Sequence, residues 1–286
     1  MNALKEPVLA WYGEFARDLP WRRPGASPWA VMVSEFMLQQ TPVSRVLPVY
    51  ETWMATWPTP ADLAAVPSGE AVRAWGRLGY PRRALRLHAC AVAITDEHGG
   101  EVPDSYDALR ALPGIGDYTA AAIASFAFGR SHAVLDTNVR RVLGRAVGGT
   151  EFPSPSVTRA ERELAGSLVP AEDPEVWAVA VMELGALVCT ASNPACARCP
   201  ILADCAWQLA GKPPYDGPPR KGQTYDKTDR QCRGRLLAVL RDADGAVPAS
   251  RLEAAWGDAT QRERSLASLL ADGLVAVSAG GYALPD

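Results

Sequence analysis

The segment Leu112-Pro113-Gly114-Ile115-Gly116 decides the fold class of this sequence. It lies between two stretches with the helical spacing of apolar residues, 107–111 and 117–128. Its two glycines allow a sharp turn that exposes backbone N–H groups beside the second helix, where an anion such as a phosphate group can bind. This pattern is typical of a helix-hairpin-helix motif. The alternative, for the segment taken alone, is a plain packing turn.

Helical patterns also fill the rest of the first 210 residues, where apolar residues recur every three or four positions without a convincing strand pattern. Residues 211–224, GKPPYDGPPRKGQT, are rich in proline and glycine, which indicates a linker. We therefore predict a mostly α fold with a large domain at 1–210, a linker at 211–228 and a small C-terminal domain at 229–286.

The C-terminal domain is predicted to be a winged-helix-like α+β domain. Its pattern is three helices and then a hairpin that turns at a pair of glycines, over residues 231–241, 248–256, 260–270 and 274–284. In one interpretation a helix-turn-helix places Gln261, Arg262 and Arg264 on DNA. In the other, the domain packs against or docks to protein.

Length and composition fit an ordinary globular protein of two domains. The chain has 286 residues, 48% hydrophobic and 21% charged, and a net charge of −3. This mildly acidic balance argues against binding to nucleic acid or acidic membranes by bulk charge. Residues 1–20 contain no signal-peptide pattern, and the longest apolar run, 120–128, is too short to cross a bilayer. We expect a cytoplasmic protein with no membrane contact, associated with the nucleoid if bacterial.

Four of the six cysteines form a cluster with the spacing C-x6-C-x2-C-x5-C, at Cys189, Cys196, Cys199 and Cys205. In a reducing compartment such a cluster indicates a metal site, and four thiolates suit either a 4Fe-4S cluster or zinc. Zinc ribbons usually contain two close CxxC pairs, and this sequence has only one, which favours iron-sulfur. The remaining two cysteines, at positions 90 and 232, are expected to be buried thiols.

Two carboxyl groups are candidates for acid and anion chemistry. Glu35 has apolar neighbours in Val31 to Leu38, and burial there would keep the carboxyl protonated, although an exposed helix edge is the alternative. Asp136 directly precedes a helical stretch, so it is either a plain N-cap or a carboxylate that the helix N-terminus keeps ionised. Cleavage of an N-glycosidic bond uses such a pair, one to protonate the leaving base and one to stabilise the cation.

These features together resemble the helix-hairpin-helix DNA glycosylases with an iron-sulfur cluster, and most closely the A/G-mismatch adenine glycosylases, the MutY family. The resemblance is collinear from about Trp11 to Trp207. It is carried by the hairpin, the clustered cysteines and the segments Leu19 to Arg22, Ser34 to Thr41, Leu78 to Tyr80, Leu135 to Asn138 and Glu183 to Ala186.

The resemblance implies a two-lobed catalytic domain, with a helical-barrel lobe at 26–132 and a cluster-bearing lobe at 1–25 and 133–210. It also implies excision of adenine paired with 8-oxoguanine or guanine in double-stranded DNA by a monomer, after the base is flipped out. Glu35 would protonate the adenine at N7, Asp136 would stabilise the oxocarbenium ion or trap it covalently, and Asn138 would orient Asp136. The implied DNA and base contacts are Trp21, Arg22, Gln39, Gln40, Thr41, Tyr80, Leu112, Gly114, Gly116, Tyr118 and Glu183.

Tyr118 predicts a glycosylase without strong strand-nicking activity. In the related endonuclease III enzymes a lysine at this point of the hairpin carries the lyase step, because its amine forms a Schiff base with the sugar. A phenol cannot form one.

The sequence departs from the family pattern at three places. Pro81 replaces a second tyrosine after Leu78-Gly79-Tyr80, residues 190–195 lack the usual basic side chains, and the C-terminal domain is shorter than the usual Nudix-like reader of 8-oxoguanine. DNA contact would then depend on basic residues at helical spacing, namely Arg73, Arg77, Arg82, Arg83 and Arg86, or these form a solvated face.

Two other functions stay open. A related enzyme could remove thymine or uracil from mismatches with guanine, although Arg22 and Glu183 beside Gln39 and Gln40 favour adenine. A regulator that binds DNA and senses redox state through the cluster would need neither Glu35 nor Asp136, so the presence of both residues argues against it.

Overall fold

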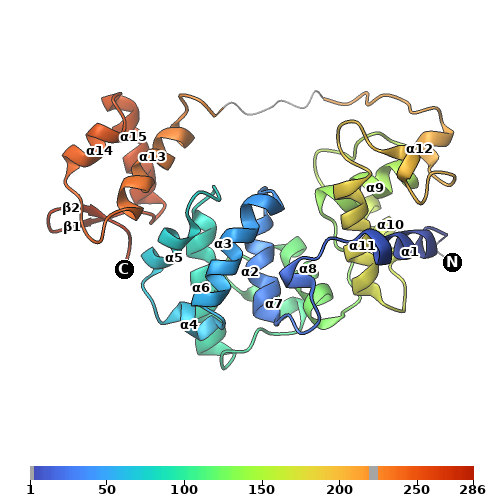
Figure 1. Cartoon of the computed structure of the whole chain (residues 1–286), viewed down its shortest axis with the longest axis horizontal. Helices are drawn as coiled ribbons and strands as arrows, with labels where there is room; N and C mark the ends of the chain where they lie inside the picture. Colours follow the sequence, from blue (N-terminus) through green and yellow to red (C-terminus); the bar gives the residue numbers. More distant parts are fainter. Residues whose placement is uncertain (1–2, 219–224) are drawn as a thin grey trace. The chain divides into compact units, whose positions relative to one another are not determined.

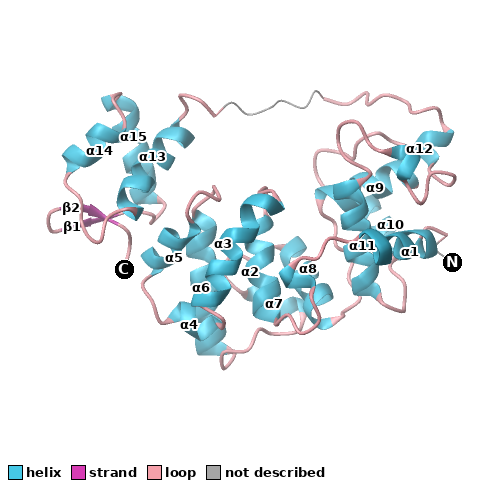
Figure 2. Cartoon of the chain, viewed as in Figure 1, coloured by secondary structure: helices cyan, strands magenta, loops and turns pink. Residues whose placement is uncertain are grey.

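The structure is a computed structural model that describes residues 3–218 and 225–286, and its regular elements are mostly helices (Figure 1, Figure 2). The predicted mostly α fold is confirmed. The chain divides into two compact units: Met1–Val31, Asp104–Arg110 and Ile115–Pro219 form the first, and Met32–Pro103, Ala111–Gly114 and Arg220–Asp286 form the second. The predicted domain and linker boundaries stay a prediction, and part of that linker, 219–224, lies outside the described residues.

The first unit is built around the packing of α1, α9 and α11. It contains α1 (Lys5–Phe15), η1 (Pro20–Arg22), α7 (Tyr106–Ala111), α8 (Asp117–Phe128), α9 (Thr137–Ala146), α10 (Arg159–Leu168), α11 (Pro174–Leu187), η2 (Cys196–Arg198) and α12 (Ala206–Leu209). Apolar faces of the three packing helices form one buried cluster that includes Val8, Trp11, Leu143, Val181 and Leu184. Burial of large apolar side chains of this kind stabilises the fold by about 1.5–3 kcal/mol each.

The helix α8 is unusually rich in alanine on its buried side. Residues 120–122 and 124 are buried alanines, so the helix can approach α11 closely. Ala122 joins Val134 and Ala178 in a second small core, against which Tyr118 packs. The position of Tyr118 on α8 is therefore fixed by the core beneath it.

In the second unit, tryptophan side chains fill the core between short helices. Its elements are α2 (Pro28–Leu38), whose first turn belongs to the first unit, α3 (Val43–Thr56), α4 (Pro60–Ala64), α5 (Ser68–Trp75) and α6 (Arg82–Glu97). Trp53 packs edge-on against Trp57 and Trp75, with ring centroids 4.7 and 5.8 Å apart. Edge-to-face packing of this kind adds about 0.5–1.5 kcal/mol per pair beyond area burial.

The C-terminal part of the second unit has the predicted order of three helices and a hairpin. It consists of α13 (Asp229–Arg241), α14 (Ala249–Ala255), α15 (Ala259–Ala271), β1 (Ala276–Ser278) and β2 (Gly281–Ala283). The two strands pair antiparallel, and an isolated bridge joins Val247 to Tyr282. The predicted helices and hairpin are confirmed to within a few residues.

Hydrogen bonds to main-chain carbonyls join this C-terminal part to α5. The N–H of Gly69 donates to the carbonyl of Pro285 at 2.9 Å, and Arg241 Nε donates to the carbonyl of Val72 at 2.9 Å. Arg73 Nη1 donates to the carbonyl of Ala243 at 2.9 Å. These bonds join the C-terminal helices to the tryptophan core of the same unit.

Across residues 3–218 and 225–286, no helix combines the length and the hydrophobicity that crossing a bilayer requires.

Candidate active site

Glu35 lies in the interior of α2 and is 5% exposed. Its neighbours along the helix are almost all buried, including Met32, Val33, Phe36 and Met37. The alternative of an exposed helix edge is therefore excluded for this residue, and the predicted burial of Glu35 is present. A carboxyl group at this place is largely removed from water.

Asp136 is the N-cap of α9, and its carboxyl group is held at both oxygens. Oδ1 accepts from the backbone N–H of Val139 at 2.6 Å, and Oδ2 accepts from Nδ2 of Asn138 at 2.8 Å. Burial raises the pKa of Asp136, although these hydrogen bonds and the charge of Arg141 lower it. The expected stabilisation of the ionised form is present but weaker than the desolvation. A carboxylate that is poorly hydrated attracts a nearby cation more strongly than a solvated one.

Asn138 is fixed by an arginine of its own helix. Arg141 Nη2 donates to Asn138 Oδ1 at 2.8 Å and to the carbonyl of Gly185 at 2.7 Å, and its Nε donates to the carbonyl of Cys189 at 2.7 Å. A Cβ at position 185 would lie 2.7 Å from Cβ of Asn138, so only glycine allows this approach of α11. Hydrogen bonds thus run from Asp136 through Asn138 and Arg141 to the loop of the clustered cysteines.

Glu183 of α11 is fully buried and binds two arginines. Its Oε1 accepts from Arg17 Nε at 2.6 Å, and its Oε2 accepts from Arg22 Nη1 at 2.9 Å. Burial alone would raise the pKa of Glu183, but the hydrogen bonds and charges of Arg17 and Arg22 outweigh it and bring the pKa to about 2. Arg22 and the buried Trp21 both belong to η1. Arg22 and Glu183, two of the implied pocket residues, are thus in direct contact, and their role in binding adenine stays a prediction.

The hairpin segment has the flanking helices that its sequence predicts, α7 and α8. Gly114 has a φ of +79°, and a Cβ there would lie 2.7 Å from Cβ of Arg86, so a larger residue does not fit. Leu112 is buried, and Gly116 is the N-cap of α8. The N–H groups of the first turn of α8 point toward this end of the helix, as an anion site requires. Tyr118 lies one residue into α8 and is half-buried.

The four clustered cysteines line one pocket, together with Arg145, Leu202 and Trp207 among others. Two other cysteines, Cys90 and Cys232, are buried as predicted. In the described ranges, 3–218 and 225–286, no group of three or more His, Cys, Asp or Glu side chains is placed to hold a metal ion. The assignment of the four thiols as ligands stays a prediction.

The chemistry of these thiols fits a cationic group at their centre. Burial, together with the neighbouring Cys189, Cys205 and Cys196, raises the pKa of Cys199 to about 11, although a backbone hydrogen bond from Ile201 lowers it. Arg145 is 1% exposed, and its Nη1 lies 3.5 Å from the sulfur of Cys189. Several thiolates in one small pocket repel one another, so all four ionise together only when iron or another cation binds them.

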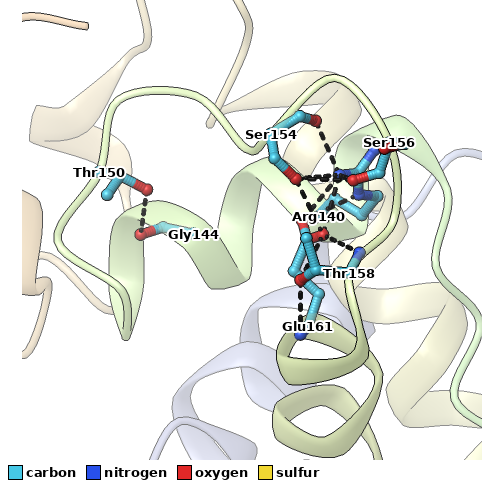
Figure 3. Close-up of polar contacts among 7 residues, drawn as sticks. All are labelled: Arg140, Gly144, Thr150, Ser154, Ser156, Thr158 and Glu161. Atoms are coloured by element: carbon cyan, nitrogen blue, oxygen red, sulfur yellow. Dashed lines mark hydrogen bonds and ion pairs between the residues drawn. The ribbon is translucent and has the colours of Figure 1, made fainter. Parts of the chain in front are cut away.

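A third arginine of α9 organises the loop that follows the helix (Figure 3). Arg140 Nη2 donates to the carbonyls of Ser154 and Ser156 and to both carboxylate oxygens of Glu161, at 2.8–3.0 Å. Glu161 also accepts from the backbone N–H of Thr158 at 2.7 Å, which completes a capping box at the start of α10. Arg140 therefore fixes the connection between α9 and α10, whereas Arg141 binds Asn138.

The segments around Gln39 and Tyr80 belong to the second unit and have unusual backbone conformations. Gln40 has a φ of 55° and Tyr80 a φ of 47°, both in the left-handed region. Gln40 and Tyr80 are exposed, Gln39 is half-buried and Thr41 is buried. We call the exposed residues Gln40 and Tyr80 the two tips; Thr41, which directly follows Gln40, is buried.

The prediction that Arg83 belongs to a DNA-facing basic row is wrong. Arg83 is 5% exposed and donates hydrogen bonds to backbone carbonyls of its own unit. Arg73 likewise binds the C-terminal part, and Arg82 pairs with Asp272 at 3.3 Å. Burial of an arginine is invisible in a periodicity pattern, because the pattern gives only the side of the helix and not the acceptors across from it.

The proposed DNA-reading side chains of the C-terminal helix α15 are bound within their own domain. Gln261 accepts from Trp256 Nε1 at 2.9 Å and donates to Asp229 at 3.0 Å, while Arg264 pairs with Asp229 at 2.6 Å. Arg262 donates to the carbonyl of Trp256 at 2.7 Å. This arrangement supports the packing interpretation of the domain.

Sequence reasoning missed the arginines that hold the site together. They are Arg17, Arg140, Arg141 and Arg145, three of which are spaced along α9 and all but fully buried. The one signal in the sequence was their place within an apolar pattern, where a charged residue must find a partner. The partners are distant in sequence, so pattern alone could not name them.

Known proteins resemble this chain in sequence and in fold. The family description "HhH-GPD superfamily base excision DNA repair protein" matches residues 33–166. An adenine DNA glycosylase of Mycobacterium tuberculosis strain H37Rv is 53% identical over 281 residues, which are 97% of this chain and 92% of the relative. The adenine DNA glycosylase of Homo sapiens is 42% identical over 218 residues, 72% of this chain and 39% of the relative.

A solved structure of a thermostable thymine-DNA glycosylase has a TM-score of 0.66 and 27% identity, and the match covers 72% of this chain and 95% of that one. The helix-hairpin-helix fold is therefore confirmed. Because the mycobacterial relative matches at 53% identity over nearly its full length, this chain belongs to the adenine DNA glycosylase family, the MutY family of helix-hairpin-helix base excision repair proteins.

Proposed function

We propose that this protein removes adenine from double-stranded DNA in which the adenine is paired with 8-oxoguanine or guanine, and that it acts as a monomer. The observation that carries the proposal is a pair of carboxyl groups in contrasting surroundings. Glu35 lies within an apolar helix, and Asp136 lies at a helix N-terminus with N–H donors on both oxygens. The adenine excision named for its relatives needs such a pair.

In this mechanism Glu35 donates a proton to N7 of the flipped adenine, so that the base leaves as a neutral molecule. The electron pair of the broken C1′–N9 bond goes to the base, and the sugar becomes an oxocarbenium ion. Asp136 stabilises this cation, and Asn138 orients the carboxylate. Water then adds to C1′ and leaves an abasic site. Stabilisation of developing charge by a fixed, poorly hydrated group of this kind is the larger part of the rate increase in many enzymes.

Binding of the substrate is assigned to three groups of residues. Trp21, Arg22, Glu183 and Tyr118 line the adenine pocket, and the hairpin at Leu112, Gly114 and Gly116 offers its N–H groups to a phosphate. Gln39 and Gln40 fill the gap in the base stack, Thr41 supports them, and Tyr80 contacts the opposite base. Since the N–H donors and wedges do most of this work, the net charge of −3 does not oppose it.

The proposal includes a 4Fe-4S cluster held by Cys189, Cys196, Cys199 and Cys205. Support comes from their spacing, from their common pocket and from the buried charge of Arg145 beside Cys189. When bound, the cluster supplies a structural cross-link between α11 and α12, and no step of base removal passes through it. Purified protein should be brown and contain about four iron atoms per chain, and chelation should lower the melting temperature.

Tyr118 makes the enzyme monofunctional in this proposal, because its phenol cannot form a Schiff base with the sugar. Borohydride treatment of the enzyme on an A:8-oxoguanine duplex should trap little covalent adduct. Abundant adduct that persists after replacement of nearby lysines and arginines would contradict the assignment.

The deciding experiment measures release of the base from four duplexes, A:8-oxoguanine, A:G, T:G and U:G, by purified protein. Release of adenine from the first two supports the proposal. Release from the last two would indicate a thymine or uracil glycosylase. That alternative is the activity named for the thymine-DNA glycosylase whose fold is similar. Full binding without release of any base would indicate a DNA-binding regulator.

A further inference from the structure

Arg83 of α6 is a buried cation whose hydrogen bonds converge on the end of α2 and the segment after it. Its Nη1 donates to three carbonyls of this chain segment, those of Phe36 at 2.8 Å, Met37 at 3.1 Å and Gln39 at 2.5 Å. A cation at the C-terminal end of a helix satisfies carbonyls that have no partner within the helix. Arg83 thus determines where α2 stops and how residue 39 leaves it.

The other nitrogen of the same guanidinium reaches a second segment. Nη2 donates to the carbonyl of Gly79 at 3.1 Å and to Oγ1 of Thr41 at 3.0 Å, and Thr41 Oγ1 in turn donates to the carbonyl of Leu78 at 3.2 Å. One side chain therefore ties residues 39–41 to residues 78–80. These segments are far apart in the sequence and belong to the same unit.

No ion pair involves Arg83 among the residues that the structure describes, and its partners there are carbonyl and hydroxyl oxygens. The faces of Trp75 and Tyr80 lie 5.3 and 5.5 Å from its guanidinium carbon. Burial lowers the pKa of Arg83 to about 10. A buried charge without a counter-charge is costly, and apolar packing would serve stability at least as well. A smaller or apolar residue could not replace the planar set of hydrogen-bond donors that the guanidinium of Arg83 provides.

The two segments that Arg83 joins end in strained, exposed tips. Gln40 and Tyr80 both have left-handed backbones, which non-glycine residues adopt at a cost, and both side chains are exposed. Such conformations persist only where surrounding contacts hold them. The contacts here include those of Arg83 and Thr41, together with a hydrogen bond from Trp75 Nε1 to the carbonyl of Gly79 at 3.0 Å.

We propose that Arg83 is a positioning residue that holds the Gln40 and Tyr80 tips in one rigid arrangement, so that both enter the DNA duplex together when adenine is flipped out. The inference rests on the proposed function. It assigns the buried guanidinium to stabilisation of the flipped state through the two tips, without contact to the reacting atoms.

The test uses the full chain with a duplex that carries 2-aminopurine opposite 8-oxoguanine, whose fluorescence rises when the base leaves the stack. Arg83→Lys keeps the charge but cannot make five hydrogen bonds. We expect the fluorescence rise on this duplex, and the single-turnover rate of adenine excision from an A:8-oxoguanine duplex, to fall together by about tenfold, because hydrogen bonds to a charged group are lost. The Kd for an undamaged duplex should change less than about twofold, since phosphate contacts set it.

Arg241→Lys is the matched control. Arg241 is a partly buried arginine whose Nε binds the carbonyl of Val72, and burial also lowers its pKa to about 10. We expect it to lower the melting temperature but to leave the fluorescence and the excision rate unchanged. Equal losses of fluorescence in both variants would overturn the proposal, as would a folded Arg83→Lys protein with wild-type fluorescence and excision.

If Arg83→Lys does not fold, Thr41→Val decides, because it removes the bridging hydroxyl and keeps the volume. We expect about a threefold fall in fluorescence and rate, because the hydrogen bonds of the hydroxyl to Arg83 and to the carbonyl of Leu78 are lost, and an unchanged signal would overturn the proposal. A wild-type protein that binds the duplex but releases no adenine would instead refute the proposed function, and the inference with it.

Discussion

The surroundings of Asp136 in the first unit and of Glu35 in the second differ in how they treat a carboxyl group. Around Asp136, N–H donors and the buried Arg141 are arranged to hold a carboxylate in one orientation. Around Glu35, the neighbours in α2 are apolar and buried. The difference teaches that two carboxyl groups removed from water can meet different neighbours in their own helices, fixed N–H donors at Asp136 and buried apolar side chains at Glu35.

Glu35→Gln should break this comparison most severely. It removes the proton donor and keeps the shape of the side chain, so we expect excision of adenine to slow by about 10⁴-fold with little change in Kd for the mismatch. Single-turnover base release and a binding titration measure the two effects. The exposed Glu51 of α3, changed to glutamine, is the matched control and should retain the wild-type rate. A Glu35→Gln protein that excises at near wild-type rate would remove Glu35 from the mechanism.

Asp136→Asn should slow excision by about 10³-fold, or about 4 kcal/mol of barrier, because the charge that stabilises the cation is lost. The same substitution should not destabilise the folded protein at neutral pH. Burial raises the pKa of Asp136, so its contribution is favourable below the unfolded pKa and is lost as pH rises through the folded pKa. At neutral pH the asparagine variant should therefore melt no lower than wild type.

The control for Asp136→Asn is Asp258→Asn, at an N-cap of α15 with the same type of bond, from the N–H of Gln261 at 2.9 Å. Asp258→Asn should leave the excision rate unchanged, because it alters an N-cap that is not part of the candidate active site. A clear loss of stability at neutral pH in Asp136→Asn alone would contradict the direction of the Asp136 pKa.

The sequence was sufficient for the elements and for the residues that local patterns mark. The hairpin glycines, the N-cap at Asp136 and the wing at Gly280 depend on neighbours in the chain, and the structure contains these elements. Glu35 could be ranked as buried or exposed only after α2 was known to be enclosed on nearly every side. Turns and helix caps can be predicted from sequence because the interacting residues lie within a few positions of one another.

The buried arginines could not be predicted, because their partners lie far along the chain. Arg17 binds Glu183 and Arg141 binds Gly185 and Cys189, separations that no periodicity encodes. Arg83 was assigned to the wrong environment for the same reason. A charge in an amphipathic pattern is ordinarily solvated, and only tertiary contacts reveal the exceptions.

Glu183→Gln sharpens the comparison through acid stability. The carboxylate is fully buried between Arg17 and Arg22, and its pKa falls from 4.5 to about 2 in the folded protein. A lowered pKa contributes stability above about pH 4.5 that is lost as pH falls toward about 2, here about 3 kcal/mol. Urea unfolding from pH 7 to pH 3 should show about 2 kcal/mol of this loss in wild type, and Glu183→Gln should lack this part of the pH dependence.

The matched control for Glu183→Gln is Glu163→Gln. Glu163 pairs with Arg159 on the surface of α10, with side chains 62% and 91% exposed, and such pairs contribute little. Its pH dependence should equal that of wild type. Identical acid profiles for wild type and Glu183→Gln would show that the buried pair does not determine acid stability.

Arg141→Met should have the smallest effect, about tenfold on the excision rate, because Arg141 acts on Asp136 only through Asn138. Its neighbour Arg140 provides the control, since it is equally buried on the same helix but binds Ser154, Ser156 and Glu161 (Figure 3). Both substitutions remove a buried guanidinium and should lower the melting temperature. Only Arg141→Met frees the amide that orients the catalytic carboxylate, so only it should slow single-turnover excision. Equal slowing in both variants would mean that α9 contributes general rigidity, and that the orientation of Asp136 does not depend on this chain of hydrogen bonds.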